Sequence, residues 1–298
     1  MREKLKAHIQ DRLDTYVFKS KQTSRAIINH DTITQKQETH KRRGAEIVKC
    51  TASARIHSIH EDEQQGEANV FYEVHIRYLI KQRDNLYLEE EADQRYAQWI
   101  DGELKQDFSL QDEGDMTSPR FIPPQEEDEQ HQQELRFKFS RMEAVRYAEQ
   151  YWNSYNPQFK KFEVNCTNYI SQCLYAGGAP MVGYPKKSGG WWMRNNDWSY
   201  TWTVAHALRW YLPSAKQGLK AKEVTSVAQL MPGDVICYDF EGDGRFDHNT
   251  IVVAKDENGE PLVNANTYNS RMRYWKYEDS TAYTPNIKYK FFHILDRN

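Results

Sequence analysis

Residues 162–180 read Phe-Glu-Val-Asn-Cys-Thr-Asn-Tyr-Ile-Ser-Gln-Cys-Leu-Tyr-Ala-Gly-Gly-Ala-Pro. This pattern predicts a helix that Asn165 caps and that Gly177 and Pro180 end. The cap places Cys166 in the first helical turn, where unpaired backbone N–H groups and the positive end of the helix dipole favour thiolate over thiol. The same N–H groups are suited to hold an oxyanion. Cys166 is therefore a candidate nucleophile.

A cysteine nucleophile needs a base, and the candidate is His248. Residues 247–254 predict an apolar strand with His248 at its entrance, after a turn and strand at 230–238. A histidine at this position, with amide side chains on the next strand, can be held in one tautomer and serve as base to a thiol. The alternative is a hydrogen-bonded histidine at a strand end. The motif alone favours that alternative slightly, but its combination with Cys166 favours the catalytic interpretation.

The residue that would orient the imidazole is ambiguous from the sequence. The next predicted strand carries two amides, Asn264 and Asn266. A two-residue turn at 258–259 would put the Asn264 side chain on the strand face opposite His248, because strand faces alternate with period two. A loop centred on Glu257 would instead put Asn266 directly across from His248 and Asn264 diagonally beside it. Both registers stay open at this point.

Five motifs occur in order along the C-terminal half: Asn-Cys-Thr-Asn-Tyr-Ile-Ser-Gln-Cys-Leu-Tyr-Ala-Gly-Gly (165–178), Asn-Asp-Trp-Ser-Tyr-Thr-Trp (196–202), Pro-Gly-Asp-Val (232–235), Gly-Asp-Gly-Arg-Phe-Asp-His (242–248) and Leu-Val-Asn-Ala (262–265). Together they resemble the bacterial putative amidase domain family over about residues 140 to 295. That family is similar in layout to the NlpC/P60 and CHAP cysteine peptidases. The resemblance therefore implies a papain-like, NlpC/P60-type domain with an antiparallel sheet packed by helices.

The resemblance also implies a Cys-His-Asn triad, with Cys166 as nucleophile, His248 as base and Asn264 as orienter. The Cys166 thiolate would attack an amide carbonyl, His248 would protonate the leaving amine, and water would hydrolyse the thioester. The implied substrates are peptide or isopeptide amides, including those of cell-wall stem peptides. Asn165 departs from the family, which commonly has Asp before the nucleophile, but a neutral amide raises the thiol pKa less than a carboxylate would.

Two other functions remain open for the same fold. One is a non-catalytic binding module, in which an aromatic cleft holds a peptide or glycan; the other is an acyltransferase that uses the same triad. Five tryptophans crowd one segment: Trp191, Trp192, Trp198, Trp202 and Trp210. Some of them must be core, because Trp202 falls near the helical spacing of Leu208 and Leu212, whereas for those near Gly189-Gly190 and Asn195 cleft wall and plain core are equally good interpretations.

The N-terminal half has a different pattern. Helical spacing from residue 2 to about 19, followed by alternating strands at 46–57 and 70–80, predicts a small module with one helix on an antiparallel meander. Acidic residues and adjacent prolines then predict a solvated linker. We expect an α+β chain divided into an N-terminal module of unknown role at 1–110, an acidic linker at 111–138 and the amidase-like domain at 139–298.

Composition excludes several classes of protein. With 40 Lys and Arg against 43 Asp and Glu, the net charge of −3 gives no general footprint for nucleic acid. No apolar run reaches the roughly 18 to 20 residues of a membrane span, and no signal peptide is evident, so we expect a cytoplasmic protein. Four scattered cysteines predict neither a disulfide scaffold nor a zinc site. We expect no cofactor or metal; a calcium loop at 239–250 is a minor alternative, and the oligomeric state stays open.

Overall fold

The computed structural model describes residues 1–18, 30–110 and 136–296, and the chain divides into two compact units. Unit 1 is Met1–Gly114 together with two short segments of the C-terminal half, Tyr268–Ser270 and Lys276–Thr281. Unit 2 holds the rest: Asp115–Thr267, Arg271–Trp275 and Ala282–Asn298. Almost all of the predicted linker lies outside the described residues, so the three predicted boundaries stay predictions.

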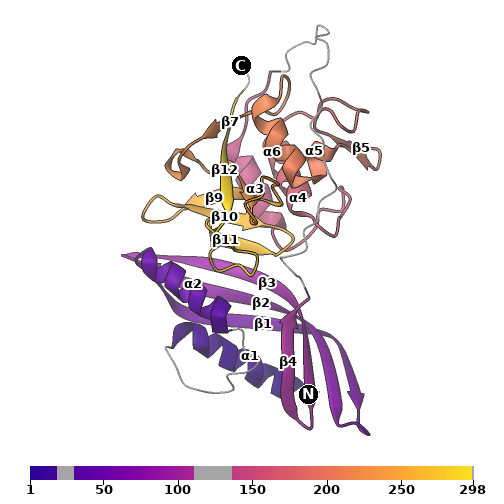
Figure 1. Ribbon diagram of the computed structural model, residues 1–298, viewed down its shortest axis with the longest axis vertical. Coiled ribbons are helices and arrows are strands. Elements are labelled where there is room, and N and C mark those ends of the chain that lie inside the picture. The colour runs from indigo at the N-terminus through magenta and orange to yellow at the C-terminus, as the bar shows by residue number, and fades with distance from the viewer. Residues whose placement is uncertain (19–29, 111–135, 297–298) are drawn as a thin grey trace. The chain divides into compact units, whose positions relative to one another are not determined.

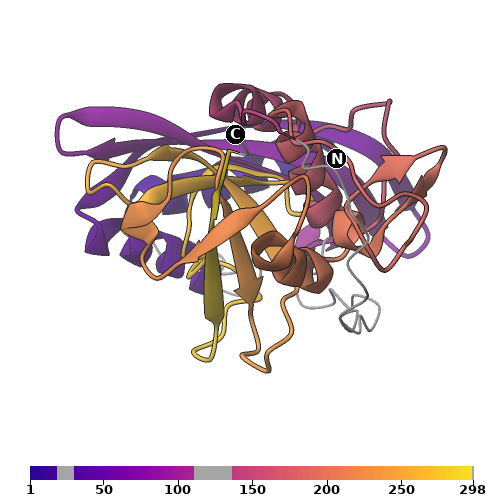
Figure 2. The ribbon, with the colours of Figure 1, turned by 90° about the horizontal axis from the view of Figure 1, so that it is seen from above.

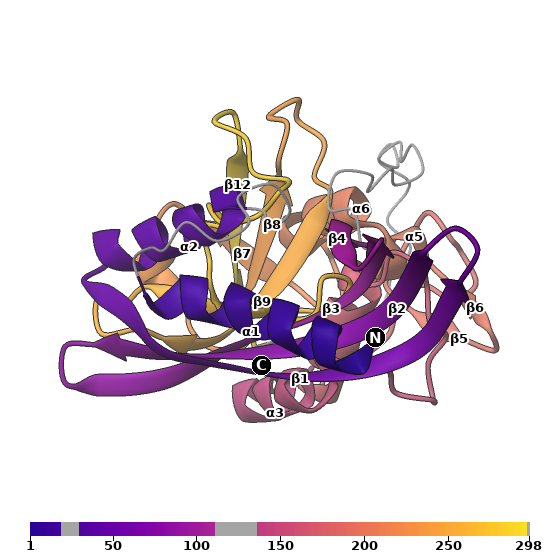
Figure 3. The ribbon, with the colours of Figure 1, turned by 90° about the horizontal axis from the view of Figure 1, so that it is seen from below.

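Unit 1 is a helix-covered antiparallel sheet, in agreement with the sequence. Its strands pair in the order β1-β2-β3-β4, and its two helices lie against one face of the sheet (Figure 3). In β2 every second side chain is buried, which is the alternation that the sequence predicted. The elements are α1 (Arg2–Val17), α2 (His30–Arg42), β1 (Ala45–Asp62), β2 (Glu67–Gln82), β3 (Asn85–Ile100) and β4 (Glu103–Ser109).

Sequence analysis missed α2. The helix holds one large buried apolar side chain, Ile33, so its hydrophobic pattern is weak. It packs instead through buried polar residues, Lys36, Thr39 and His40. Polar residues on a buried face are stable only with partners that come from elsewhere in the fold, and a sequence pattern does not reveal those.

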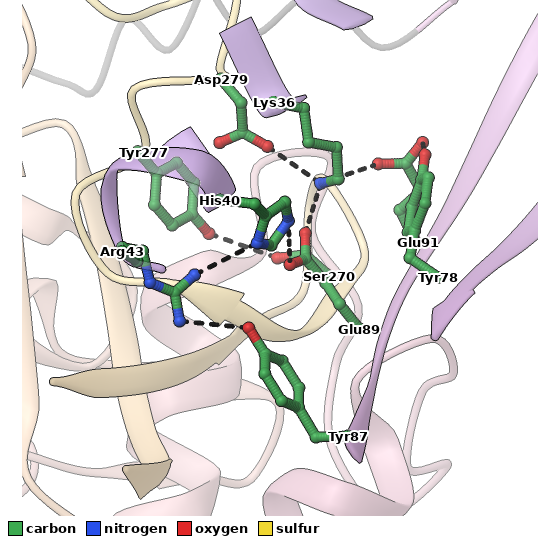
Figure 4. Close-up of polar contacts among 10 residues, drawn as sticks. All are labelled: Lys36, His40, Arg43, Tyr78, Tyr87, Glu89, Glu91, Ser270, Tyr277 and Asp279. Atoms are coloured by element: carbon green, nitrogen blue, oxygen red, sulfur yellow. Dashed lines mark hydrogen bonds and ion pairs between the residues drawn. The ribbon is translucent and has the colours of Figure 1, made fainter. Parts of the chain in front are cut away.

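The partners of α2 form a buried ion cluster (Figure 4). The Lys36 ammonium donates to the Glu89 carboxylate and lies 2.9 Å from Asp279 Oδ2. His40 Nε2 lies 3.4 Å from Glu89 Oε2. Burial alone would raise the pKa of Glu89, but the Lys36 charge and the His40 hydrogen bond outweigh burial and lower it to about 2. The cluster joins α2 and β3 to the 276–281 segment within unit 1.

Unit 2 is α+β with a mostly antiparallel sheet, which confirms the predicted fold class. The strands follow the order β11-β10-β9-β8-β12-β7, and helices α3 and α4 pack on β9 and β10 (Figures 1 and 2). The helices are α3 (Arg141–Tyr151), α4 (Cys166–Ala176), α5 (Tyr200–Thr203) and α6 (Ala205–Ser214), with a 3-10 turn η1 (Val227–Gln229). The strands are β5 (Met193–Arg194), β6 (Asp197–Trp198), β7 (Ala221–Val224), β8 (Val235–Asp239), β9 (His248–Lys255), β10 (Pro261–Ala265), β11 (Ser270–Tyr274) and β12 (Lys288–Ile294).

Most of the crowded tryptophans belong to the core. Trp191, Trp192 and Trp202 are buried, and the rings of Trp191 and Trp202 are 4.6 Å apart. Trp198 is half-buried and Trp210 is exposed. For the three buried rings, the core interpretation is therefore the correct one.

No helix in residues 1–18, 30–110 and 136–296 is long and apolar enough to span a bilayer. The location in the cell stays a prediction.

Candidate active site

Helix α4 begins at Cys166, as predicted, and Gly177 follows its last residue. Asn165 occupies the N-cap position, but the expected cap is wrong because its side chain makes no capping hydrogen bond. Its φ and ψ of −113° and −4° differ from the extended backbone of a capping residue. Its amide instead donates to Asn266 Oδ1 at 2.8 Å and accepts from Asn168 Nδ2 at 2.9 Å.

The Cys166 thiol is enclosed, with 1% of the residue exposed. Its Sγ lies 3.7 Å from Thr167 Oγ1, and the backbone N–H of Asn249 and the Thr267 hydroxyl lie close enough to lower its pKa. Burial raises the pKa of the thiol, and these hydrogen bonds offset only part of that effect. The helix start was expected to favour the thiolate; in this structure the loss of hydration dominates and favours the thiol.

His248 is the first residue of β9, as predicted, and is buried. It pairs with Tyr238 of β8, and its ring centroid lies 5.7 Å from that of Tyr238 and 6.1 Å from that of Phe240. Burial and the positive charge of Arg273 lower the pKa of His248 to about 3. The imidazole is therefore neutral at physiological pH.

Alternation along β9 separates the thiol from the imidazole. Asn249 follows His248, and its Nδ2 donates to Thr167 Oγ1 of α4 at 3.1 Å. The Asn249 side of the strand is therefore the face covered by α4, which we call the helix face. His248, one residue earlier and packed on Tyr238, points to the opposite face. The structure brings the Cys166 helix and the His248 strand together, but not the two reacting side chains.

Asn264 lies on the helix face. A bulge between Leu262 and Val263 shifts the register of β10, so Asn264 pairs with Ile251, which neither predicted register anticipated. Its Nδ2 donates to Glu149 Oε1 of α3 at 2.8 Å, and its Oδ1 accepts from the backbone N–H of Met272 at 2.8 Å. These contacts join α3 to β11 and do not connect Asn264 to the imidazole.

Asn266, the other candidate orienter, holds the nucleophile loop. Its Nδ2 lies 2.8 to 3.2 Å from three carbonyls at the end of α3, those of Tyr151, Trp152 and Ser154, so its two hydrogens are shared among three acceptors. Its Oδ1 accepts from Asn165. Thr267 adds a further link, because its Oγ1 accepts from the backbone N–H of Asn165 at 2.9 Å.

Sequence reasoning missed three residues next to the thiol, Thr167, Asn249 and Thr267. Thr167 directly follows Cys166, and Asn249 directly follows His248. Their polar side chains beside the candidate pair were the signal in the sequence that could have identified them. Thr267 lay beyond the last predicted strand, and only the fold places it beside the nucleophile.

The loop before His248 is a tight turn. Asp239 Oδ1 and Oδ2 accept the backbone N–H groups of Gly242 and Gly244, at 2.7 and 2.8 Å. Burial raises the pKa of Asp247, the residue before His248, to about 7. Within the described residues, no three His, Cys, Asp or Glu side chains are grouped to hold a metal ion.

The Pro-Gly-Asp-Val motif has a structural role. Asp234 is buried and accepts from Arg141 NH1 at 2.6 Å and from the backbone N–H groups of Met231 and Ile294. It also lies 2.8 Å from His293 Nδ1. One carboxylate thus joins the start of α3, the turn before β8 and the last strand.

Comparison with known proteins identifies the family. Residues 138–292 match the family described as "Putative amidase domain". A Bacillus subtilis (strain 168) protein titled "Uncharacterized protein YhbB" is 50% identical over 266 residues, which cover 88% of this chain and 85% of the relative. Another from the same strain, titled "Uncharacterized protein YjcM", is 33% identical over 126 residues, 39% of this chain and 28% of the relative. No solved structure matches, so the papain-like resemblance stays a prediction. The chain belongs to the putative amidase domain family, as its motifs predicted.

Proposed function

We propose that unit 2 is a cysteine-dependent amide hydrolase in which Cys166 is the nucleophile and His248 the base. Membership of the amidase family supports amide hydrolysis. The observation that carries the residue assignment is the junction of α4 and β9. There Cys166 and Thr167 contact the backbone and side chain of Asn249, the residue after His248.

The reaction requires the imidazole to reach the thiol. A neutral imidazole can accept the Cys166 proton, but in the structure it lies on the opposite face of β9. His248 is the terminal residue of its strand, so turning it toward the helix face would disturb one cross-strand pair, that with Tyr238. Asn264 already lies on the helix face, and we propose that it orients the ring there.

The proposed chemistry has two stages. His248 first takes the proton of the Cys166 thiol, and the thiolate attacks the amide carbonyl. The protonated His248 then gives this proton to the leaving amine, and a thioester remains. Water then attacks the thioester, with His248 taking its proton, and the acid and the free thiol are released. The proposed substrates are peptide or isopeptide amides, with cell-wall stem peptides among them.

The test is release of amine from a panel of peptides, isopeptides and muropeptides. We expect the wild type to release amine from at least one class and the Cys166→Ala variant from none. Selective alkylation of Cys166 by iodoacetamide provides a second measurement. Cys50 is the internal control, because burial raises its thiol pKa to about 12.

One observation favours a second function, a non-catalytic peptide- or glycan-binding module. The thiol is buried with a raised pKa, and the imidazole lies on the other face of the sheet. Binding of a panel member without release of amine, together with a Cys166 no more reactive than Cys50, would support this function and contradict the hydrolase.

A further inference from the structure

A hollow opens on unit 2 beside the start of α4. Its walls come from the end of α3, the loop at 152–165 and α4, and the space between them is that of about one water molecule or one carboxylate oxygen. The residues that matter for its chemistry are Tyr155, Phe159, Lys160, Lys161, Asn165 and Asn168.

The side chains that line the hollow are either cationic or uncharged. The lining holds two lysines, Lys160 and Lys161, together with amides, a serine and aromatic rings, and none of its residues is acidic. The Lys161 ammonium lies 4.1 Å from the Tyr155 ring centroid, and that of Lys160 lies 4.5 Å from the Trp198 ring centroid. Stacking on aromatic rings holds both ammonium groups near the hollow without neutralising them. Glu163, two residues after Lys161, is exposed and does not line the hollow.

The hollow is lined by residues that neighbour the nucleophile in the chain. Asn165 and Asn168 line it; Asn165 directly precedes Cys166, and Asn168 follows it by two residues. The backbone N–H of Asn165 donates to Thr267 Oγ1, and the Thr267 hydroxyl lies close enough to the thiol to lower its pKa. A group bound in the hollow would therefore lie close to a bond that Cys166 attacks.

We propose that this hollow is a substrate subsite that binds a carboxylate adjacent to the scissile amide. The two ammonium groups, Lys160 and Lys161, match the negative charge of a carboxylate and can donate hydrogen bonds to its oxygens. The inference rests on the proposed function and narrows its substrates to amides of acidic peptides, those with a free carboxylate next to the cleaved bond.

The test compares two alkylating reagents at Cys166 in the full chain. Iodoacetate carries a carboxylate and iodoacetamide does not, and both react with the same thiolate. The ratio of their rates therefore cancels any effect of a substitution on the thiol pKa. Replacing both lysines, in a Lys160→Gln/Lys161→Gln variant, should lower the iodoacetate to iodoacetamide ratio about three- to fivefold at low salt, and 0.5 M salt should remove most of the difference. Mass spectrometry of the Cys166 peptide gives both rates.

Two control variants isolate charge at this position. Lys160→Arg/Lys161→Arg keeps both charges and should keep the wild-type ratio, and Lys222→Gln removes an exposed charge on β7 and should also leave it unchanged. An unchanged ratio in the double glutamine variant would overturn the subsite while leaving the nucleophile intact. A Cys166 that reacts with neither reagent faster than Cys50 would overturn the proposed function, and the subsite with it.

Discussion

The two units bury polar side chains in opposite ways. The cluster of unit 1 is ionic: Lys36 is shared by Glu89 and Asp279, so each charge has an opposite charge beside it. The cluster around Cys166 in unit 2 consists of neutral amides and hydroxyls, among them Asn165, Asn266 and Thr267.

The difference shows how burial acts on an ionisable group. In unit 1 a nearby opposite charge outweighs burial and lowers the pKa of Glu89 to about 2. In unit 2 no such charge is among the main influences on the thiol, so burial raises the pKa of Cys166. We therefore expect substitutions in the ionic cluster to change mainly the stability of the chain, and substitutions in the neutral cluster to change mainly the reactivity of Cys166.

The largest expected effect is on reactivity. Cys166→Ala should lower kcat/KM at least about a thousandfold, because the attacking atom is lost. The fold should survive, since the change removes a small neutral group and leaves no charge unpaired. Amine release and thermal unfolding of the full chain measure the two quantities. Residual activity near the wild-type level would end the assignment of the nucleophile.

Removing the cation of unit 1 should have the opposite result. Lys36→Met should lower the free energy of unfolding by about 3–5 kcal/mol, because it leaves the Glu89 and Asp279 carboxylates buried without their cation. Urea denaturation measures this loss. Lys105→Met is the matched control: it breaks an exposed 2.7 Å ion pair with Glu103 and should leave the free energy of unfolding nearly unchanged, because solvent screens both charges. Equal losses in the two variants would refute the ionic account of unit 1.

Acid should lower the stability of the chain in two steps, one from His248 of unit 2 and one from Glu89 of unit 1. His248 has a pKa of about 3 when folded against 6.5 as its ordinary value, so the unfolded chain binds more protons between these values and stability falls as pH falls. From pH 7 to 4.5 the loss should reach about 2.5 kcal/mol, and His248→Phe should abolish it. The contribution of Glu89 is present above pH 4.5 and is lost between 4.5 and about 2; Glu89→Gln should remove that second phase. A wild-type stability that stays constant from pH 7 to 4.5 would contradict the buried neutral imidazole.

Substitutions of Asn264 and Asn266, the two candidate orienters, should affect stability and turnover to different degrees. Asn266→Ala removes an amide whose two hydrogens are shared among three carbonyls and whose oxygen accepts one hydrogen bond, and should cost about 2–3 kcal/mol of stability; Asn264→Ala removes two hydrogen bonds and should cost about 1–2 kcal/mol. For kcat we expect the reverse ranking, with about a 10- to 1,000-fold loss in Asn264→Ala and a smaller one in Asn266→Ala. Kinetics at a temperature where both variants are folded decides the ranking. A larger loss of kcat in Asn266→Ala would assign the catalytic role to Asn266.

The smallest expected effect concerns the second cysteine of α4. Cys173 is fully buried, and burial raises its pKa far above the ordinary value. Cys173→Ala should cost about 1 kcal/mol of stability, as a small truncation in the core, and should preserve turnover. Loss of turnover in a well-folded Cys173→Ala protein would show that the wrong cysteine was assigned.

The sequence by itself determined the family and the elements that carry the candidate nucleophile and base. Residues 165–178 carry the start of α4, its end and the candidate nucleophile in one continuous run, and residues 247–254 carry the strand with His248 at its first position. Local propensity and alternation suffice for such features, because each depends on neighbours a few residues away. The same reasoning predicted α1 and the meander of unit 1, and it missed α2, whose packing relies on distant ion pairs.

Tertiary structure decided how these residues face one another. The bulge at Leu262 and Val263 set the register of Asn264, and a one-residue shift moves a side chain to the other face of a sheet. Pairing of β8 with β9 placed the His248 ring on Tyr238, away from Cys166. Burial then raised the thiol pKa that the helix start alone was expected to lower. Face, register and hydration depend on contacts between segments up to about a hundred residues apart, such as Asn165 and Asn266, and for that reason only the folded chain specifies them.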